Sequence, residues 1–281
     1  MKKHFSFANR NTADGTAPDL ATVTAAGFTE ISFSLAGGDL SPKAVLAARE
    51  GGLLPEALLL PSEAVNLLWE TPEPKEKPEG WLPTDGREPN EASWEALRDL
   101  YDYCFTIAAR LGVARVILLP SMGLGVPAVS QVGLFRLREL AALARAKDVR
   151  ILIENEKSAP HFAAATRAVA DGFHGVSFSP AKAWRYYGTS ALPSYAAEHL
   201  QRLSLDDGKG EDFGYLPFDG DTDFQPFARS MASVHFRGTM AISPDRSLFP
   251  YSTVDGFAFL SDAYDKLSTL LRMIKEEEGS V

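Results

Sequence analysis

The sequence has very little cysteine, no long apolar segment and no run of basic residues. Cys104 is the one cysteine among 281 residues, so a disulfide within the chain is excluded and a reducing compartment fits. No stretch approaches the roughly 20 apolar residues of a membrane-spanning helix. The start of the chain, Met1 to Ser6, has no apolar segment behind its charges and does not resemble a secretory signal. We therefore expect a cytoplasmic protein without a membrane partner.

The charge balance is acidic, with a formal net charge of −9. Such a chain repels phosphate backbones, and no cluster of Lys and Arg offsets this repulsion, so nucleic acid is not an expected partner. The composition leaves the oligomeric state open, and a homo-oligomer remains one of the alternatives.

Several familiar catalytic motifs are also missing. The five histidines form no His-x-x-x-His pair, which leaves no helical metal-binding motif of that kind. No Gly-x-Ser-x-Gly turn supports a serine hydrolase. The first strand-like segment is not followed by Gly-x-Gly-x-x-Gly, so a dinucleotide-binding fold is not indicated.

The sequence does contain eight strand-like segments that alternate with eight helical segments. The strand-like segments are 4–8, 28–35, 53–60, 113–119, 149–156, 175–178, 202–205 and 233–242. The helical segments are 19–26, 41–50, 93–111, 129–147, 161–170, 193–200, 224–232 and 257–275. Strict alternation implies parallel strands joined by crossover helices, and eight such units favour one α/β domain, a single (β/α)8 TIM barrel over residues 1–281. A doubly wound open sheet is the alternative.

A proline-rich excursion at about 70–93 interrupts this rhythm. Five prolines among charges and glycines exclude a helix or a central strand there. Long loops of this kind are either lids or merely mobile segments. Trp69, Trp81 and Trp94 bracket the excursion, and we expect them to attach it to the body of the fold; stacking on a substrate is the alternative.

The fifth strand-like segment ends in charge, as Ile151-Leu152-Ile153-Glu154-Asn155-Glu156. In parallel α/β proteins the carboxyl ends of the strands are where chemistry usually occurs. Glu154 and Glu156 are two residues apart and share a face, so they could perform acid/base work or pair with arginine. Asp206 and Asp207 end the seventh strand; we expect one to point into the barrel mouth and the other to cap the following loop.

Four stretches together resemble a known superfamily. They are Ala109-Arg110-Leu111-Gly112 before an apolar strand, Ile151 to Asn155, Leu203-Ser204-Leu205-Asp206-Asp207, and the loop 216–224 with sequence LPFDGDTDF. Their order and spacing resemble the xylose-isomerase-like barrels of sugar isomerases, epimerases and related endonucleases, over about residues 5 to 275. The resemblance implies a barrel that binds a small polyhydroxylated ligand at its C-terminal face.

The resemblance also implies a divalent metal, held by Glu, Asp, His and Glu from strands five to eight. Glu154 matches the first position, whereas Ser179, Ser204 and Ser243 match the other three. One carboxylate and three hydroxyls would hold a hard cation very weakly. We therefore expect no cofactor; Mn, Mg, Co or Zn at Glu154 is the disfavoured alternative.

A cation of the protein itself could replace the metal. Lys182 follows Ser179 by three residues, where many members of the superfamily carry histidine. Our hypothesis is that its ammonium pairs with Glu154, although Lys157, Lys182 and Arg185 could equally be surface charges. The expected catalytic residues are Glu154, Glu156 and Lys182. The expected substrate-binding residues are Asn9, Asn155, Ser179, Arg185, Ser204, Asp206, Asp207 and Ser243.

These features predict a sugar isomerase/epimerase-like barrel of carbohydrate metabolism with an altered or lost metal site. If it is an enzyme, it moves a proton next to a carbonyl, with Glu154 as the candidate base. A non-catalytic sugar-binding or regulatory barrel is the alternative. A metal-dependent endonuclease is disfavoured by the acidic charge and by the missing ligands.

Overall fold

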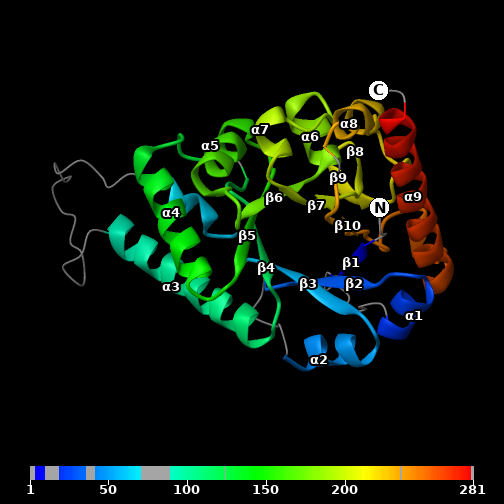
Figure 1. The fold of residues 1–281 in the computed structure, drawn as a ribbon, viewed down its shortest axis with the longest axis horizontal. Helices are drawn as coiled ribbons and strands as arrows, with labels where there is room; N and C mark the ends of the chain where they lie inside the picture. The colour runs from blue at the N-terminus through cyan, green and yellow to red at the C-terminus, as the bar shows by residue number, and fades with distance from the viewer. Residues whose placement is uncertain are drawn as a thin grey trace.

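Eight parallel strands close into a barrel in the computed structural model, which describes residues 4–9, 19–35, 42–70, 89–123, 125–234 and 236–279 (Figure 1). Each strand pairs in parallel with its two neighbours, and β10 pairs with β1 to complete the ring. In their order around the barrel the strands are β1 (Phe5–Asn9), β10 (Thr239–Ile242), β7 (Leu200–Ser204), β6 (Gly175–Phe178), β5 (Arg150–Glu154), β4 (Arg115–Leu118), β3 (Leu54–Leu59) and β2 (Glu30–Ser34). The prediction of a single (β/α)8 barrel is confirmed.

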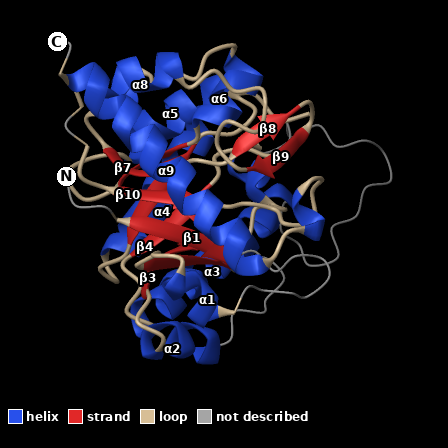
Figure 2. Cartoon of the chain, turned by 90° about the vertical axis from the view of Figure 1, so that its right-hand side faces the viewer, coloured by secondary structure: helices blue, strands red, loops and turns tan. Residues whose placement is uncertain are grey.

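Helices surround the barrel on its outer face, as the two perpendicular views show (Figures 1 and 2). The α-helices are α1 (Leu20–Ala25), α2 (Pro42–Glu50), α3 (Pro89–Arg110), α4 (Gln131–Arg145), α5 (Ala159–Val169), α6 (Pro180–Tyr187), α7 (Ser194–Ala197), α8 (Gln225–Met231) and α9 (Gly256–Glu278). Two short 3₁₀ helices, η2 (Val65–Leu68) and η3 (Tyr251–Thr253), lie in connections. In the described part of the chain no helix is long and apolar enough to cross a membrane.

Two elements near the carboxyl ends of the strands differ from the prediction. Helix α6 was not predicted, because Pro180 was interpreted only as the end of a strand. The expected loop up to Asp223 contains an antiparallel hairpin, β8 (Asp207–Lys209) and β9 (Asp212–Tyr215). The final strand is also shorter than predicted, because β10 begins at Thr239 rather than at residue 233. Most of the predicted excursion at 70–93 lies outside the described residues, and its last part is wrong, because α3 already begins at Pro89.

The apolar core lies between the helices and the strands. Trp69 is fully buried there, and its Nε1 donates a 2.6 Å hydrogen bond to the backbone oxygen of Pro120. Trp94 is 3% exposed, so the two described tryptophans that bracket the excursion pack into the body of the fold as expected; Trp81 lies outside the described residues. Cys104 is also buried in this core, as its position in an apolar helix pattern predicted.

The interior of the barrel, in contrast, carries polar and charged side chains. Strand residues point alternately to the two faces of a sheet, so every second residue of each strand faces the barrel axis. Several buried polar residues from different strands contact one another across that axis: Ser6, Ser32, Glu56, Glu154, Ser177 and Arg202. A charged network therefore fills the space that leads to the carboxyl ends of the strands.

Candidate active site at the barrel mouth

Arg202, on β7, lies at the centre of this network. Its side chain is 2% exposed, and its Nε donates to Glu56 on β3 at 2.9 Å. Its Nη1 donates to Glu154 on β5 at 3.3 Å. A buried guanidinium with no partner would be very costly, and here two carboxylates from two other strands offset its charge. Burial alone would lower the pKa of Arg202, but the charges of Glu56 and Glu154 raise it above its usual value.

Glu154 closes β5 and is held by three donors. Its Oε2 accepts from the hydroxyl of Ser177 at 2.7 Å and from Arg202, and its Oε1 accepts from Nζ of Lys182 at 3.1 Å. Burial alone would raise the pKa of Glu154, but the charges of Lys182 and Arg202 and the Ser177 hydrogen bond outweigh burial and lower it. Glu154 is therefore a stable carboxylate and a weak proton acceptor.

Lys182 stands between two carboxylates. Its Nζ lies 3.1 Å from Oε1 of Glu154 and 2.8 Å from Oε2 of Glu156, with its side chain 11% exposed. Burial would lower the pKa of Lys182, but the two carboxylates raise it well above its usual range. The amine therefore remains protonated, and it can act as a cation and hydrogen-bond donor but not as a free nucleophile.

The start of α6 places Lys182 at this position. Ser179 is the N-cap of the helix and Pro180 its first residue, and the hydroxyl of Ser179 accepts from the backbone N–H of Lys182 at 3.3 Å. The amide of Asn155 fixes the same turn, because its Nδ2 donates to the Ser179 oxygen at 2.9 Å and its Oδ1 accepts from the Ser179 N–H at 2.7 Å. Asn155 and Ser179 are both fully buried, so their polar groups hold the start of α6 in place from below the surface of the site.

The two aspartates after β7 have different surroundings. Asp206 is 1% exposed, and its negative charge acts on both Lys182 and Arg202. Asp207 instead accepts hydrogen bonds from backbone N–H groups of the following loop, at Gly208, Phe218, Gly220 and Thr222. One aspartate thus faces the charged network and the other organises the loop, as the sequence predicted.

The other residues predicted for the site lie at varied positions. Ser204 is nearly buried and donates a long 3.4 Å hydrogen bond to Asp206, and Ser243 is 5% exposed just after β10. Arg185 lies further out and forms an ion pair with Glu211. Lys157 lies over the ring of Tyr186 rather than against Glu154. Asn9 ends β1, and its side chain is outside the described part of the structure.

Five members of the network were not predicted as site residues: Ser6, Ser32, Glu56, Ser177 and Arg202. A signal was present, because Arg202 and Ser204 are two residues apart on β7 and so share one face of the strand. Likewise, Glu56 is a lone charge inside the apolar segment of β3. Charges on the inward face of a strand indicate a polar barrel interior.

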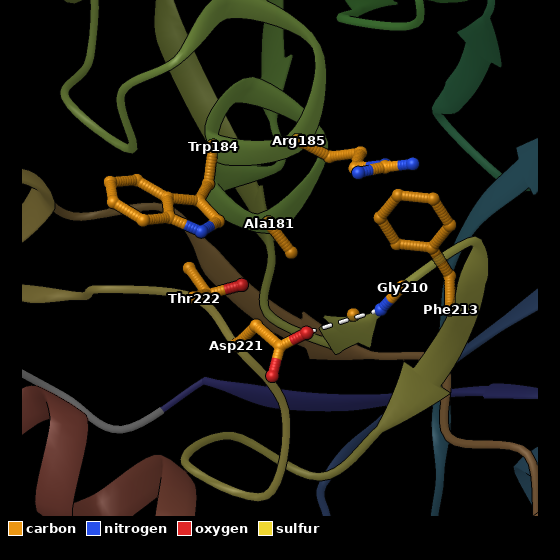
Figure 3. A pocket seen from close by; sticks show the side chains of 8 residues that line it. Ala181, Trp184, Arg185, Gly210, Phe213, Asp221 and Thr222 are labelled. Atoms are coloured by element: carbon orange, nitrogen blue, oxygen red, sulfur yellow. Dashed lines mark hydrogen bonds between the residues drawn. The ribbon is translucent and has the colours of Figure 1, made fainter.

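A small pocket borders α6, the helix that carries Lys182. It has a volume of about 130 Å³ and lies between α6 and the β8–β9 hairpin, where Ala181, Trp184, Phe213, Asp221 and Thr222 line it (Figure 3). Both α6 and the hairpin follow carboxyl ends of strands, so the pocket opens on the same side as Lys182. Within the described ranges, no three His, Cys, Asp or Glu side chains gather in the geometry of a metal site.

The fold and this mouth define the class of protein, a (β/α)8 barrel with charged side chains at the carboxyl ends of its strands. The sequence of residues 81–261 matches the family described as xylose isomerase-like TIM barrel, and the chain belongs to that family. No curated protein matches the sequence.

Solved structures show the same fold at low sequence identity. An L-ribulose 3-epimerase superposes with a TM-score of 0.69 and 13% identity, covering 98% of this chain and 97% of that one. A D-psicose 3-epimerase of Clostridium cellulolyticum H10, in complex with D-tagatose, superposes with a TM-score of 0.69 and 12% identity, covering 96% and 99% of the two chains. A D-allulose 3-epimerase of a Methylomonas species gives a TM-score of 0.62 at 14% identity over 98% and 97%. At such identities the likeness shows the fold.

Proposed function

We propose that the chain is a sugar isomerase or epimerase that moves a proton next to the carbonyl of a small polyhydroxylated ligand, and that it does so without a divalent metal. The observation that carries the proposal is the ammonium of Lys182, placed between Glu154 and Glu156 at 3.1 and 2.8 Å at the barrel mouth. A cation and a carboxylate side by side are the two groups that such a proton transfer needs. The family and its sugar-epimerase neighbours support the choice of substrate class.

The residues around Glu154 fit a divalent cation poorly. Such an ion prefers carboxylate, imidazole and water ligands, whereas the hydroxyl of Ser179 already caps α6 and that of Ser204 donates to Asp206. Lys182 and Arg202 also bring two positive charges to Glu154, which would repel a metal ion at the same carboxylate. This disagreement with the family's usual ligand set supports a site whose cations belong to the protein.

Each group at the mouth then has a separate role. Glu154 holds the ammonium in place and, with three donors on its oxygens, has little capacity to take a further proton. Glu156 accepts the proton from the carbon next to the carbonyl; the C–H bond breaks, and its electron pair forms the double bond of an enediolate. Lys182 donates a hydrogen bond to the oxygen on which negative charge develops. Glu156 returns the proton to the neighbouring carbon to give an isomer, while the proton of the neighbouring hydroxyl moves to the former carbonyl oxygen. An epimer forms when water delivers a proton to the opposite face of the first carbon and Glu156 releases its proton to solvent.

The test is exchange of carbon-bound hydrogen with solvent. The protein is incubated in D₂O with D-fructose, D-tagatose or D-allulose, and deuterium next to the carbonyl is followed by NMR, with and without EDTA. We expect exchange that EDTA does not affect and that Glu156→Gln slows by about 100-fold or more. Glu198→Gln, the same change at an exposed glutamate, is the control and should have no effect. Loss of exchange on metal removal, restored by Mn²⁺, would refute the metal-free site.

A non-catalytic sugar-binding barrel is the second candidate. The observation that favours it is the complete engagement of Glu154, which is 5% exposed and paired with two cations and a hydroxyl. Such a network can hold the barrel together and shape a ligand site without taking part in a reaction. Saturable binding of one of the three ketoses with no deuterium incorporation would favour this function over the enzyme.

A further inference from the structure

We propose that the pocket between α6 and the β8–β9 hairpin binds the far end of the ligand whose carbonyl lies at Lys182, and that this end carries hydroxyl groups and no phosphate. The inference rests on the proposed function and extends it, because it defines the ligand as an unphosphorylated sugar. Four observations support it: the position of the pocket, the chemistry of its lining, the rigidity of its wall and its charge.

The position follows from the geometry of α6. Ala181, Trp184 and Arg185 line the pocket, while Lys182 of the same helix contacts Glu154 and Glu156. These residues lie within about one helical turn, which rises roughly 5.4 Å. One side of α6 therefore holds the ammonium and the next side borders the pocket, and a short sugar chain can reach from one to the other.

The lining combines an aromatic surface with polar groups. The indole of half-buried Trp184 and the ring of Phe213 stand on opposite sides, and the carboxylate of Asp221 and the side chain of Thr222 lie between them (Figure 3). Apolar surface suits the C–H groups of a sugar, and the carboxylate accepts hydrogen bonds from hydroxyl groups. At about 130 Å³ the pocket accommodates part of a small ligand rather than an extended one.

The hairpin wall is fixed before any ligand arrives. Asp221 Oδ2 accepts from the backbone N–H of Gly210 at 3.1 Å, and the N–H of Asp221 donates to the oxygen of Gly208 at 2.7 Å (Figure 3). The fully buried carboxylate of Asp207 holds the next turn of the same loop, up to Thr222. Because these hydrogen bonds already fix the hairpin and the loop that follows it, the two lose little conformational entropy when a ligand binds, which favours affinity.

The charges argue against a phosphate group. Arg185 is the one cation that lines the described pocket, and Glu211 already neutralises it. Asp221 adds a negative charge to the pocket. On the side of Lys182, the three carboxylates of Glu154, Glu156 and Asp206 outnumber the two cations Lys182 and Arg202. A phosphate dianion would be repelled there, whereas a neutral hydroxyl-bearing chain end would not.

The first test compares affinities for D-fructose and D-fructose 6-phosphate by calorimetric titration. We expect the wild type to bind D-fructose at least about tenfold more tightly than the phosphate ester. Asp221→Asn should weaken D-fructose binding about fivefold or more and reduce the difference in affinity between D-fructose and D-fructose 6-phosphate. The substitution removes the negative charge but keeps a side-chain oxygen that can accept from the N–H of Gly210. Asp212→Asn, the same change at an exposed site of the same hairpin, is the matched control and should bind as the wild type.

Equal or tighter binding of the phosphate ester, or an Asp221→Asn variant that behaves as the wild type, would overturn the proposal. A second measurement locates the ligand directly: the indole N–H signal of Trp184, assigned with Trp184→Phe, should shift when D-fructose is added. The shift should persist in Glu156→Gln, which has lost deuterium exchange. A shift without any exchange in the wild type would refute the enzymatic function but keep the subsite, whereas exchange without a shift would refute the subsite alone.

Discussion

The guanidinium of Arg202 on β7 donates to Glu56 on β3 at 2.9 Å, and so joins two strands on opposite sides of the barrel. The same guanidinium contacts Glu154 on β5. A side chain that is 2% exposed and ties together three strands places one fixed charge on the barrel axis. Removal of that charge would take one cation from each of two buried carboxylates, and would leave Glu154 with Lys182 and Glu56 with Arg115 at 3.6 Å.

We therefore expect Arg202→Met to destabilise the protein by about 3–5 kcal/mol. The double variant Arg202→Met with Glu56→Gln should recover part of this loss, because one of the two buried carboxylates that lose the Arg202 guanidinium is then neutral. Urea unfolding followed by circular dichroism measures both free energies. Arg229→Met, at an exposed arginine of α8, is the control. A loss below about 1 kcal/mol in Arg202→Met would contradict the central role of this side chain.

The pH dependence of stability should report on Glu154. Its pKa is lowered in the folded protein, so its contribution is complete above the unfolded pKa of about 4.3 and is lost as the pH falls through the folded pKa. The stability difference between wild type and Glu154→Gln should thus be constant from about pH 7 to 5.5 and shrink below about pH 4. Urea midpoints at several pH values measure it. A difference that grows in acid would contradict the assigned direction.

Gly133 on α4 should not tolerate a methyl group. A Cβ at this position would lie 3.0 Å from the backbone oxygen of Leu68 and closer still to the indole of Trp69. Because Trp69 is fully buried and its Nε1 is bonded, the indole cannot move aside easily. We expect Gly133→Ala to destabilise the protein by about 1–3 kcal/mol, measured as a lower urea midpoint. Gly172→Ala, where a methyl group meets open space, should be close to neutral.

Most of the fold could be predicted from the pattern of strands and helices in the sequence, because that pattern depends on residues close together along the chain. Alternation of apolar segments with amphipathic ones identifies parallel strands and crossover helices. Strand β6, for example, begins and ends at the residues predicted for it. Helix α6 was missed although Ser179-Pro180 is a helix start, an N-cap followed by proline at the first position. The β8–β9 hairpin was missed because Gly208 within β8 and Gly210 in the turn also suit a loop.

The site could be anticipated only in part, because its contacts join residues far apart in sequence. The pairing of Lys182 with Glu154 was proposed from a family resemblance, and the structure brings the two side chains together. The alternation of Arg202 and Ser204 could have placed Arg202 on the inward face of its strand, but it could not have identified the partners of Arg202, which lie 48 and 146 positions away. Only closure of the barrel brings these charges together.

The loop after β7 offers a final prediction, because one carboxylate holds it. Asp207 is fully buried and accepts from four backbone N–H groups between Gly208 and Thr222. In Asp207→Asn an amide N–H₂ group would face some of these donors and leave them unpaired, so we expect a loss of about 1–3 kcal/mol in stability. Hydrogen exchange should reveal the cause: the amides of Phe218, Gly220 and Thr222 should lose protection, while those of β5 keep it. Unchanged protection in this loop would mean that the turn holds its shape without Asp207.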